Sequence, residues 1–425
     1  MLKKLIIIVF MLVSTQVLAQ YKTDVIVLGA SAAGTATAIQ AARSGVKVIL
    51  LEPNNFSLGA IAPSMDVPAF NFGIWKEWKD LYTRKLDSLQ TDPRIALESI
   101  ISKVNNLRYF KETQIVKVIK KGKSWEISIQ KNGSKIEKIK AEVLVDAFFE
   151  AEASPVLKAG IVKLSDGHIK TISKYTPLEL QKPYEQVLKL YRSSGATGFG
   201  KDSTMLHYFP MGVFISAEVD NLMFVSPQAG LVGWQADDFK NIATWVNIGQ
   251  LGGALSAYGP FFDTETAKAN VRLSQGEIFN YKGLIYPVTD INTNEYAWNA
   301  VQKIIATDVM KHDFAKGKFN PEEHVKPEDI KAILSDLYPR SRIWFIENPI
   351  KELTLKDAIS LISFITGREI YDMNRELSTN WKMKYELESN FNEKNYVTKK
   401  EMTIIFDTYL NPYSIGVNMQ GIFIK

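Results

Sequence analysis

The 425-residue sequence contains no cysteine, which excludes disulfide bonds, thiolate nucleophiles, cysteine-held metals and lipid attachment through cysteine. Its only histidines, His168, His207, His312 and His324, do not have the spacing of metal ligands. We therefore expect no metal site. The net charge of +5 is small for this length, and the lysines are interspersed with acidic residues. Because nucleic-acid-binding proteins gather basic residues on one face, we expect no nucleic-acid partner.

Long apolar runs are absent after the first twenty residues, so we expect no stable membrane span in the rest of the chain. In the opening MLKKLIIIVFMLVSTQVLAQ, two lysines precede a short apolar run, and small residues follow before Gln20. This order is typical of a cleaved secretory signal peptide over residues 1–19, with a retained anchor as the alternative. The sequence therefore predicts an exported protein, periplasmic or extracellular.

Residues 25–53 read VIVLGASAAGTATAIQAARSGVKVILLEP and predict a βαβ unit. An apolar strand leads into a tight turn and an alanine-rich helix, and a second apolar strand follows Gly45. In such units the N–H groups at the helix start bind a pyrophosphate, and an acid after the second strand binds a ribose. We predict that the cofactor-binding residues here are Gly29, Ala30, Ser31, Ala32, Ala33, Gly34, Glu52 and Pro53.

Ser31 stands where the dinucleotide-binding pattern Gly-x-Gly-x-x-Gly has its middle glycine. A serine is small enough for a phosphate to approach. Its hydroxyl could obstruct the phosphate or donate a hydrogen bond to it. A βαβ unit of the same shape that binds nothing is the alternative, and the turn alone leaves both interpretations open.

With this turn the chain resembles the bacterial FAD-dependent oxidoreductases that open with Gly-x-(Thr/Ser/Gly)-x-Ala-Gly, many of them exported. Threonine or serine is frequent at the middle position of that family, so Ser31 fits. The resemblance implies FAD and an α/β fold: a Rossmann-like FAD/NAD(P)-binding domain with an inserted β-meander. Residues 107–148 agree, because they predict strands, a hairpin turn at Asn132-Gly133 and a strand ending at Asp146.

The resemblance implies further cofactor contacts at Asp146, Gly249, Gly252 and Gly253. Residues 240–258 match the family's closing helix, with Lys240 at the position of an arginine. Other motifs depart from the family. Phe148-Phe149 replace Thr-Gly after Asp146-Ala147, and residues 225–227, Val-Ser-Pro, replace Ala-Gly-Arg. Two phenylalanines at this point would fill space that a flavin needs.

The resemblance covers most of residues 21–262, and we expect the flavin domain to span 20–265. Only about 60 residues, 154–211, stand where the family has a longer insertion, which predicts a reduced substrate domain. No residue identifies itself as catalytic; His207 and Lys240 are candidates because they lie near the segment that returns to the flavin domain.

The sequence predicts an exported FAD-dependent oxidoreductase acting on a small-molecule or saccharide-derived substrate. The alternative is a non-catalytic descendant that has lost FAD and serves as an envelope-associated binding or structural protein. A polysaccharide lyase is a third interpretation, but the sequence lacks the Tyr/His/Arg/Asn cluster that such an enzyme requires.

Residues 285–425 predict a separate α-helical, repeat-like domain. Its start resembles a surface-layer-homology module, with the turn Gly-Lys-Phe-Asn-Pro at 317–321 and a helix start at 326–329. Amphipathic segments from Leu353 and Val397 repeat the helix start with a threonine cap. All three lack the arginine that grips anionic wall polymer in such modules. Cell-wall polymer binding is therefore doubtful, and a helical scaffold packed on the flavin domain is the favoured interpretation.

Overall fold

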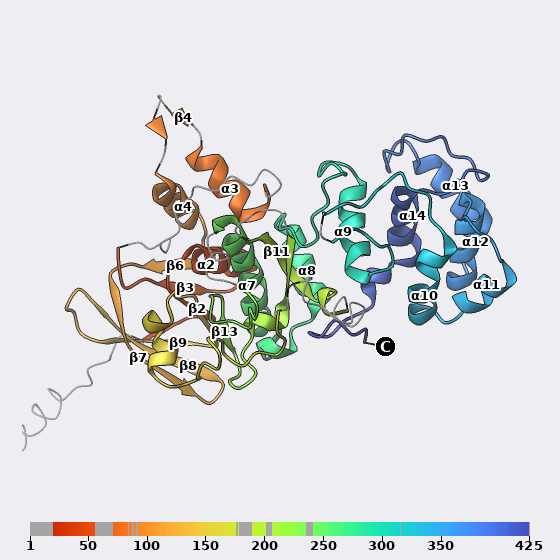
Figure 1. The fold of residues 1–425 in the computed structure, drawn as a ribbon. Helices are drawn as coiled ribbons and strands as arrows, with labels where there is room; N and C mark the ends of the chain where they lie inside the picture. The colour runs from red at the N-terminus through yellow and green to blue at the C-terminus, as the bar shows by residue number, and fades with distance from the viewer. Residues whose placement is uncertain are drawn as a thin grey trace, which may run out of the picture.

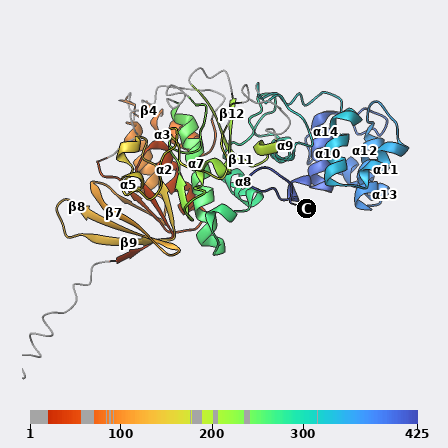
Figure 2. The same cartoon turned by 60° about the horizontal axis from the view of Figure 1, so that its bottom comes forward.

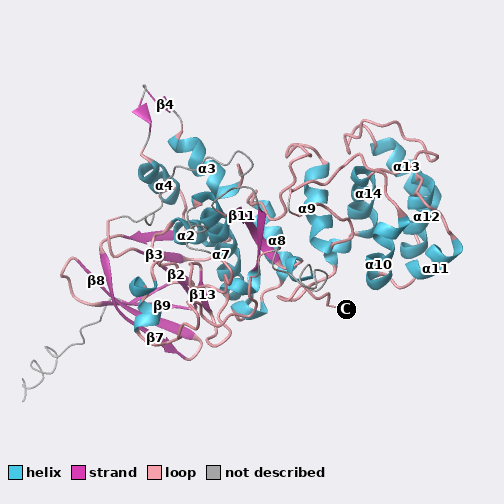
Figure 3. Cartoon of the chain, in the orientation of Figure 1, coloured by secondary structure: helices cyan, strands magenta, loops and turns pink. Residues whose placement is uncertain are grey.

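The computed structural model describes residues 20–55, 71–83, 85–86, 89–90, 92–175, 177, 189–200, 206–234, 241–314 and 316–424. An α/β part occupies the first two thirds of the chain, and a helical part follows it (Figures 1 and 3). The predicted signal peptide and Lys240 lie outside the described residues.

The centre of the α/β part is a five-stranded parallel sheet in the order β13-β10-β2-β3-β6. In four of the five strands, β13, β10, β2 and β3, every residue is buried, as in parallel sheets that are covered on both faces. This topology confirms the Rossmann-like fold class. The strands are β2 (Val25–Leu28), β3 (Val48–Leu51), β6 (Leu107–Phe110), β10 (Val143–Asp146) and β13 (Leu222–Phe224).

A second sheet confirms the predicted β-meander. Its central strand is β8 (Ser124–Lys131), which pairs antiparallel with β7 (Thr113–Lys121) on one side and with β9 (Glu137–Ala141) on the other. The short strand β1 (Gln20–Lys22) pairs with β9 in parallel. The predicted hairpin turn follows β8, where Asn132 and Gly133 both have positive φ angles.

Helices α2 (Ala32–Arg43) and α7 (Ile242–Phe262) pack side by side against the sheet. Their close approach depends on glycines of α7. A Cβ atom on Gly249 would overlap the carbonyl oxygen of Ala33, and one on Gly253 would overlap Gln40. Small residues at such contacts let two helix backbones come together.

Other elements surround this core. Helices α3 (Gly73–Tyr82) and α4 (Pro93–Ile101), with the short strands β4 (Lys85–Leu86) and β5 (Leu89–Gln90), project from it (Figure 1). The short helix α5 (Pro155–Lys158) follows β10. An antiparallel hairpin of β11 (Ser194–Phe199) and β12 (Leu206–Pro210) packs on α7, as does α8 (Val271–Asn280).

The C-terminal part is helical, as predicted, and closes around a ring of backbone hydrogen bonds. Val325 N–H donates to Val397 C=O at 3.0 Å, Val397 to Leu353 at 2.8 Å, and Leu353 to Val325 at 3.3 Å. Each of these residues stands two positions before the first residue of α10, α12 or α14. The three predicted repeats therefore meet at one point. The helices are α9 (Ala297–Thr307), α10 (Pro327–Leu337), α11 (Ser341–Glu347), α12 (Leu355–Thr366), α13 (Ile370–Asn380) and α14 (Lys399–Ile405).

Buried polar contacts join the two parts, which lie side by side in both views (Figures 1 and 2). The guanidinium of Arg272 on α8 donates to the carbonyl groups of Arg192, Ala306 and Ile415. The carbonyl of Met419 accepts the hydroxyl of Ser193 at 3.0 Å. In the described part of the chain, no helix is both long and apolar enough to cross a bilayer.

Candidate dinucleotide site

The candidate site is the turn at the carboxyl end of β2, between the ends of β3 and β10. Gly29 has φ +94, which glycine adopts without strain, and its N–H donates to Leu51 C=O at 2.8 Å. A Cβ atom on Gly34 would overlap the carbonyl oxygen of Gly29. The geometry therefore requires glycine at both of these predicted positions, one for the turn and one for the approach of α2.

Ser31 is the N-cap of α2. Its hydroxyl oxygen accepts the N–H of Gly34 at 3.0 Å, and its O–H donates to Ala147 C=O at 2.8 Å. The hydroxyl thus satisfies one of the unpaired donors at the helix start and ties the turn to the end of β10. The sequence left open whether the hydroxyl obstructs a phosphate or binds it; the structure shows that it caps α2, and its predicted contact with a cofactor stays a prediction.

The N–H groups of Ala32 and Ala33 are the donors that remain at the start of α2. Within the described residues neither has a hydrogen-bond acceptor, and both residues are buried. The first N–H groups of a helix point out of its N-terminus, where the helix dipole favours an anion. The structure therefore leaves two backbone donors at a helix start, where the dipole favours an anion such as a pyrophosphate.

Glu52 lies at the end of β3, facing the turn, as predicted. It is only 2% exposed, and its carboxylate accepts the N–H of Ala30 at 2.8 Å and that of Asn54 at 3.0 Å. Each carboxylate oxygen can accept two hydrogen bonds, so capacity for hydroxyl donors remains. Pro53, next to Glu52 in the chain, borders a polar cavity of about 590 Å³, which Glu112 and the β7 residue Gln114 also line.

Asp146 lies at the end of β10, next to the turn, but its carboxylate accepts hydrogen bonds from the segment that follows β10. It is fully buried and accepts the hydroxyl of Ser154 at 2.5 Å and the N–H of Phe148 at 3.2 Å. Burial raises its pKa to about 6. These bonds fix the segment after β10 over the turn; contact between Asp146 and a cofactor stays a prediction.

The glycines Gly249, Gly252 and Gly253 lie on the half of α7 that contacts α2. Gly249 lies opposite Ala33 in the turn, and Gly252 is in close contact with Thr37 and Val225. Helix packing is therefore a sufficient physical reason for all three glycines. Their predicted contact with a cofactor stays untested.

Phe149 and His207 belong to one aromatic cluster. The ring of Phe149 lies 5.8 Å from that of Trp245 on α7, and Trp245 contacts Trp234. Trp234 in turn lies 5.1 Å from His207, whose Nδ1 is hydrogen-bonded to the hydroxyl of Tyr175. The structure thus connects the end of β10 to the candidate His207 through aromatic side chains.

Residues 24–161 match the family model of FAD dependent oxidoreductase. The match includes the turn, Glu52, the meander and Asp146. It ends before the β11–β12 hairpin, α7 and the C-terminal helices. It supports FAD as the dinucleotide expected at this turn.

Solved structures of flavoenzymes and related oxidoreductases show only distant similarity. L-proline dehydrogenase from P. horikoshii has a TM-score of 0.31 and 14% identity, over 65% of this chain and 62% of its own. Bacillithiol disulfide reductase Bdr (YpdA) from Bacillus cereus scores 0.22 with 18% identity, over 30% and 40%. p-Nitrophenol 4-monooxygenase PnpA from Pseudomonas putida DLL-E4 scores 0.22 with 13% identity, over 31% and 41%. No curated protein sequence matches the chain.

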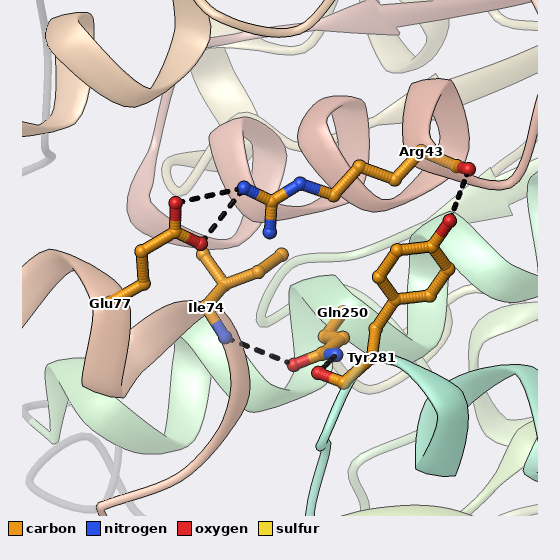
Figure 4. A network of polar contacts seen from close by, with 5 residues as sticks. All are labelled: Arg43, Ile74, Glu77, Gln250 and Tyr281. Atoms are coloured by element: carbon orange, nitrogen blue, oxygen red, sulfur yellow. Dashed lines mark hydrogen bonds and ion pairs between the residues drawn. The ribbon is translucent and has the colours of Figure 1, made fainter.

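A polar network behind the turn fixes four helices relative to one another (Figure 4). Gln250 on α7 accepts the N–H of Ile74 on α3 at 3.3 Å and donates to the carbonyl of Tyr281 at 3.1 Å. The Tyr281 hydroxyl donates to Arg43 C=O at 2.5 Å. The Nη2 atom of Arg43 donates to both carboxylate oxygens of Glu77, at 2.9 and 2.8 Å. The network holds α2 in place from its last residue, Arg43.

The sequence did not reveal this network or the aromatic cluster. Gln250 was visible only as part of the closing-helix motif. Arg43, Glu77 and Tyr281 gave no signal, because residues far apart in the chain meet only in the folded protein. The density of aromatic residues at 207–209 and at Trp234 and Trp245 was the one hint of the cluster.

Proposed function

We propose that this chain is an exported FAD-dependent oxidoreductase that acts on a small-molecule substrate, saccharide-derived or other. The observation that carries the proposal is the pair of unclaimed N–H groups, Ala32 and Ala33, at the start of α2 beside the carboxylate of Glu52. A bound flavin would supply electron transfer.

In this proposal the residues of the turn fit the ADP half of the cofactor. The N–H groups of Ala32 and Ala33 bind the pyrophosphate, and Glu52 accepts the ribose hydroxyls. Ser31 acts indirectly, because it holds the helix start and Ala147 in position. Phe149 and Trp245 bound the region toward His207, the residue we propose for proton transfer to or from the substrate.

The test is the visible spectrum of the purified chain before and after addition of FAD and gel filtration. Flavin absorbance that co-elutes with the protein is the expected result. A folded, colourless chain that does not retain added FAD would overturn the proposal in favour of a scaffold that has lost its cofactor.

Glu52→Gln assigns the binding to this site. An amide there places a donor against the N–H of Ala30 or Asn54 and removes the charge, so FAD should bind at least about tenfold more weakly. Glu112→Gln is the matched control, because this exposed acid borders the neighbouring cavity without contacting the turn. Equal loss in both variants would argue against the assignment.

A further inference from the structure

A second cavity lies near the amino ends of the parallel strands, whereas the turn lies at their carboxyl ends. It has a volume of about 380 Å³ and lies between the last turns of α7 and the helix α8. Its position follows from α7: Gly249 contacts the turn at Ala33, whereas Gly259 lies near Val143, the first residue of β10. The turn follows the last residues of the strands, so the two sites are separate.

Aromatic and aliphatic side chains form most of this cavity. Tyr258, Phe261 and Phe262 come from α7, and Leu273 comes from α8. The Tyr258 and Phe262 rings have centroids 4.5 Å apart. Phe261, Phe262 and Leu273 are 64%, 51% and 53% exposed, and exposed apolar side chains gathered around one cavity mark an interaction site. The volume lies in the range of small-molecule sites.

Two polar residues of α8, Ser274 and Glu277, border the same cavity. Ser274 and Glu277 are three residues apart, so they share one side of the helix. Ser274 is 2% exposed, and its hydroxyl has no hydrogen-bond partner in the described structure. The carboxylate of Glu277 is half-buried, and no described residue pairs with it.

Two charged residues of opposite sign, Arg272 and Glu277, line this cavity. Arg272 is the only cationic residue that lines it, and its guanidinium is engaged by the carbonyls of Arg192, Ala306 and Ile415 and by Gln275. Glu277 is therefore the one charged group left to meet a ligand. A carboxylate among aromatic rings suits a cation, because ring faces also attract positive charge.

We propose that this cavity binds an organic amine with an apolar body. The ammonium group donates to the carboxylate of Glu277, and the body lies against Tyr258, Phe262 and Leu273. This site is independent of the dinucleotide turn, so its occupancy does not depend on FAD.

The test is calorimetric titration of the full chain with phenethylamine, phenethyl alcohol and hydrocinnamate. These probes share a ring and differ in charge. We expect the amine to bind about tenfold or more tightly than the alcohol, and the acid not to bind. Equal binding of amine and acid, or no binding of the amine by folded protein, would overturn the proposal.

Two variants locate the binding. Glu277→Gln should weaken amine binding about tenfold, whereas Glu328→Gln, an exposed acid on α10, should leave it unchanged. Gly276→Leu should block the cavity and still fold, because a Cβ there meets no atom within 4 Å and the backbone is helical. Unchanged binding in Glu277→Gln would contradict the assignment.

The exposed rings could instead be covered by a second copy of the chain. Sedimentation of the wild type and of Phe261→Glu distinguishes this case. A dimer that Phe261→Glu dissociates, together with no amine binding, would assign the patch to self-association and overturn the small-molecule proposal. A monomer that binds the amine supports it.

Discussion

At the scale of single residues, the hydroxyl of Ser31 connects the turn both to the start of α2 and to the residue after β10. It accepts from Gly34 and donates to Ala147, so both of its hydrogen-bonding roles are used inside the protein. A glycine at this position would leave the start of α2 without its cap and the turn without its tie to β10. The serine therefore has a structural reason that does not require a phosphate.

Ser31→Gly should lower the free energy of unfolding by about 1 kcal/mol, through loss of the cap and of one side-chain hydrogen bond. FAD affinity should stay within a few-fold of the wild type, because the donors of Ala32 and Ala33 are unchanged. Thermal unfolding and fluorescence titration with FAD measure the two quantities. A large loss of affinity with little loss of stability would show instead that the hydroxyl binds the phosphate.

Asp146 gives a prediction about pH. Burial raises its pKa from 3.8 to about 6 in the folded protein, so the folded state holds the proton more tightly than the unfolded state. Stability should therefore be greatest below pH 3.8 as far as this group is concerned, and should fall by up to about 3 kcal/mol as the pH rises to about 6. Above that value its contribution is constant.

Asp146→Asn isolates this effect. The amide oxygen can still accept from Phe148, and the amide group can donate to the hydroxyl of Ser154, so the variant should fold. Chemical denaturation at several pH values should give a difference between variant and wild type that grows in favour of the variant up to about pH 6. A difference that does not change with pH would contradict the shifted pKa.

At the scale of elements, the contact between α2 and α7 determines where the start of α2 lies. The two helix backbones approach closely at Gly249 and Gly253, and the Gln250 network fixes the same region from the side of α3 and α8. A change that separates the helices should therefore affect both stability and the cofactor site.

Gly249→Ala should lower the free energy of unfolding by about 1–3 kcal/mol, because the new methyl group overlaps the backbone oxygen of Ala33. FAD binding should weaken as well, since Ala33 moves with that contact. Gly276→Ala in α8 is the control: it has open space, so it should be neutral or stabilising by up to about 1 kcal/mol. Denaturant unfolding of both variants checks this, and equal effects would contradict the packing argument.

The sequence predicts those elements that depend on residues close together in the chain. Local patterns predicted β2, α2, β3, the meander and the C-terminal helices, because apolar periodicity and the turn residues Gly29 and Gly133 act over a few positions. They predicted the positions of Gly34 and Glu52 for the same reason. The family resemblance, and no local pattern, assigned Gly249, Gly252 and Gly253 to a cofactor. Their packing against α2 does not test that assignment, because a glycine required by a neighbouring helix looks the same in sequence as one required by a ligand.

At the scale of the whole molecule, the two parts of the chain are joined by a buried cation. Arg272 binds three backbone carbonyls that belong to different segments, at Arg192, Ala306 and Ile415. Its ring partner Tyr413 lies 4.9 Å away, and the Tyr413 hydroxyl donates to the carbonyl of Arg272. Burial lowers the pKa of Arg272, so the charge is held at a cost that these bonds offset.

Arg272→Gln should therefore separate the unfolding of the two parts. A glutamine cannot reach all three carbonyls, and each buried acceptor left unpaired costs about 1–3 kcal/mol. The control Arg342→Gln removes an exposed arginine on α11 and should leave unfolding unchanged. Calorimetry should show one transition becoming two in Arg272→Gln. A single transition at the wild-type temperature would mean that the junction is held by its apolar contacts, because the loss of three hydrogen bonds would then have no effect on coupling.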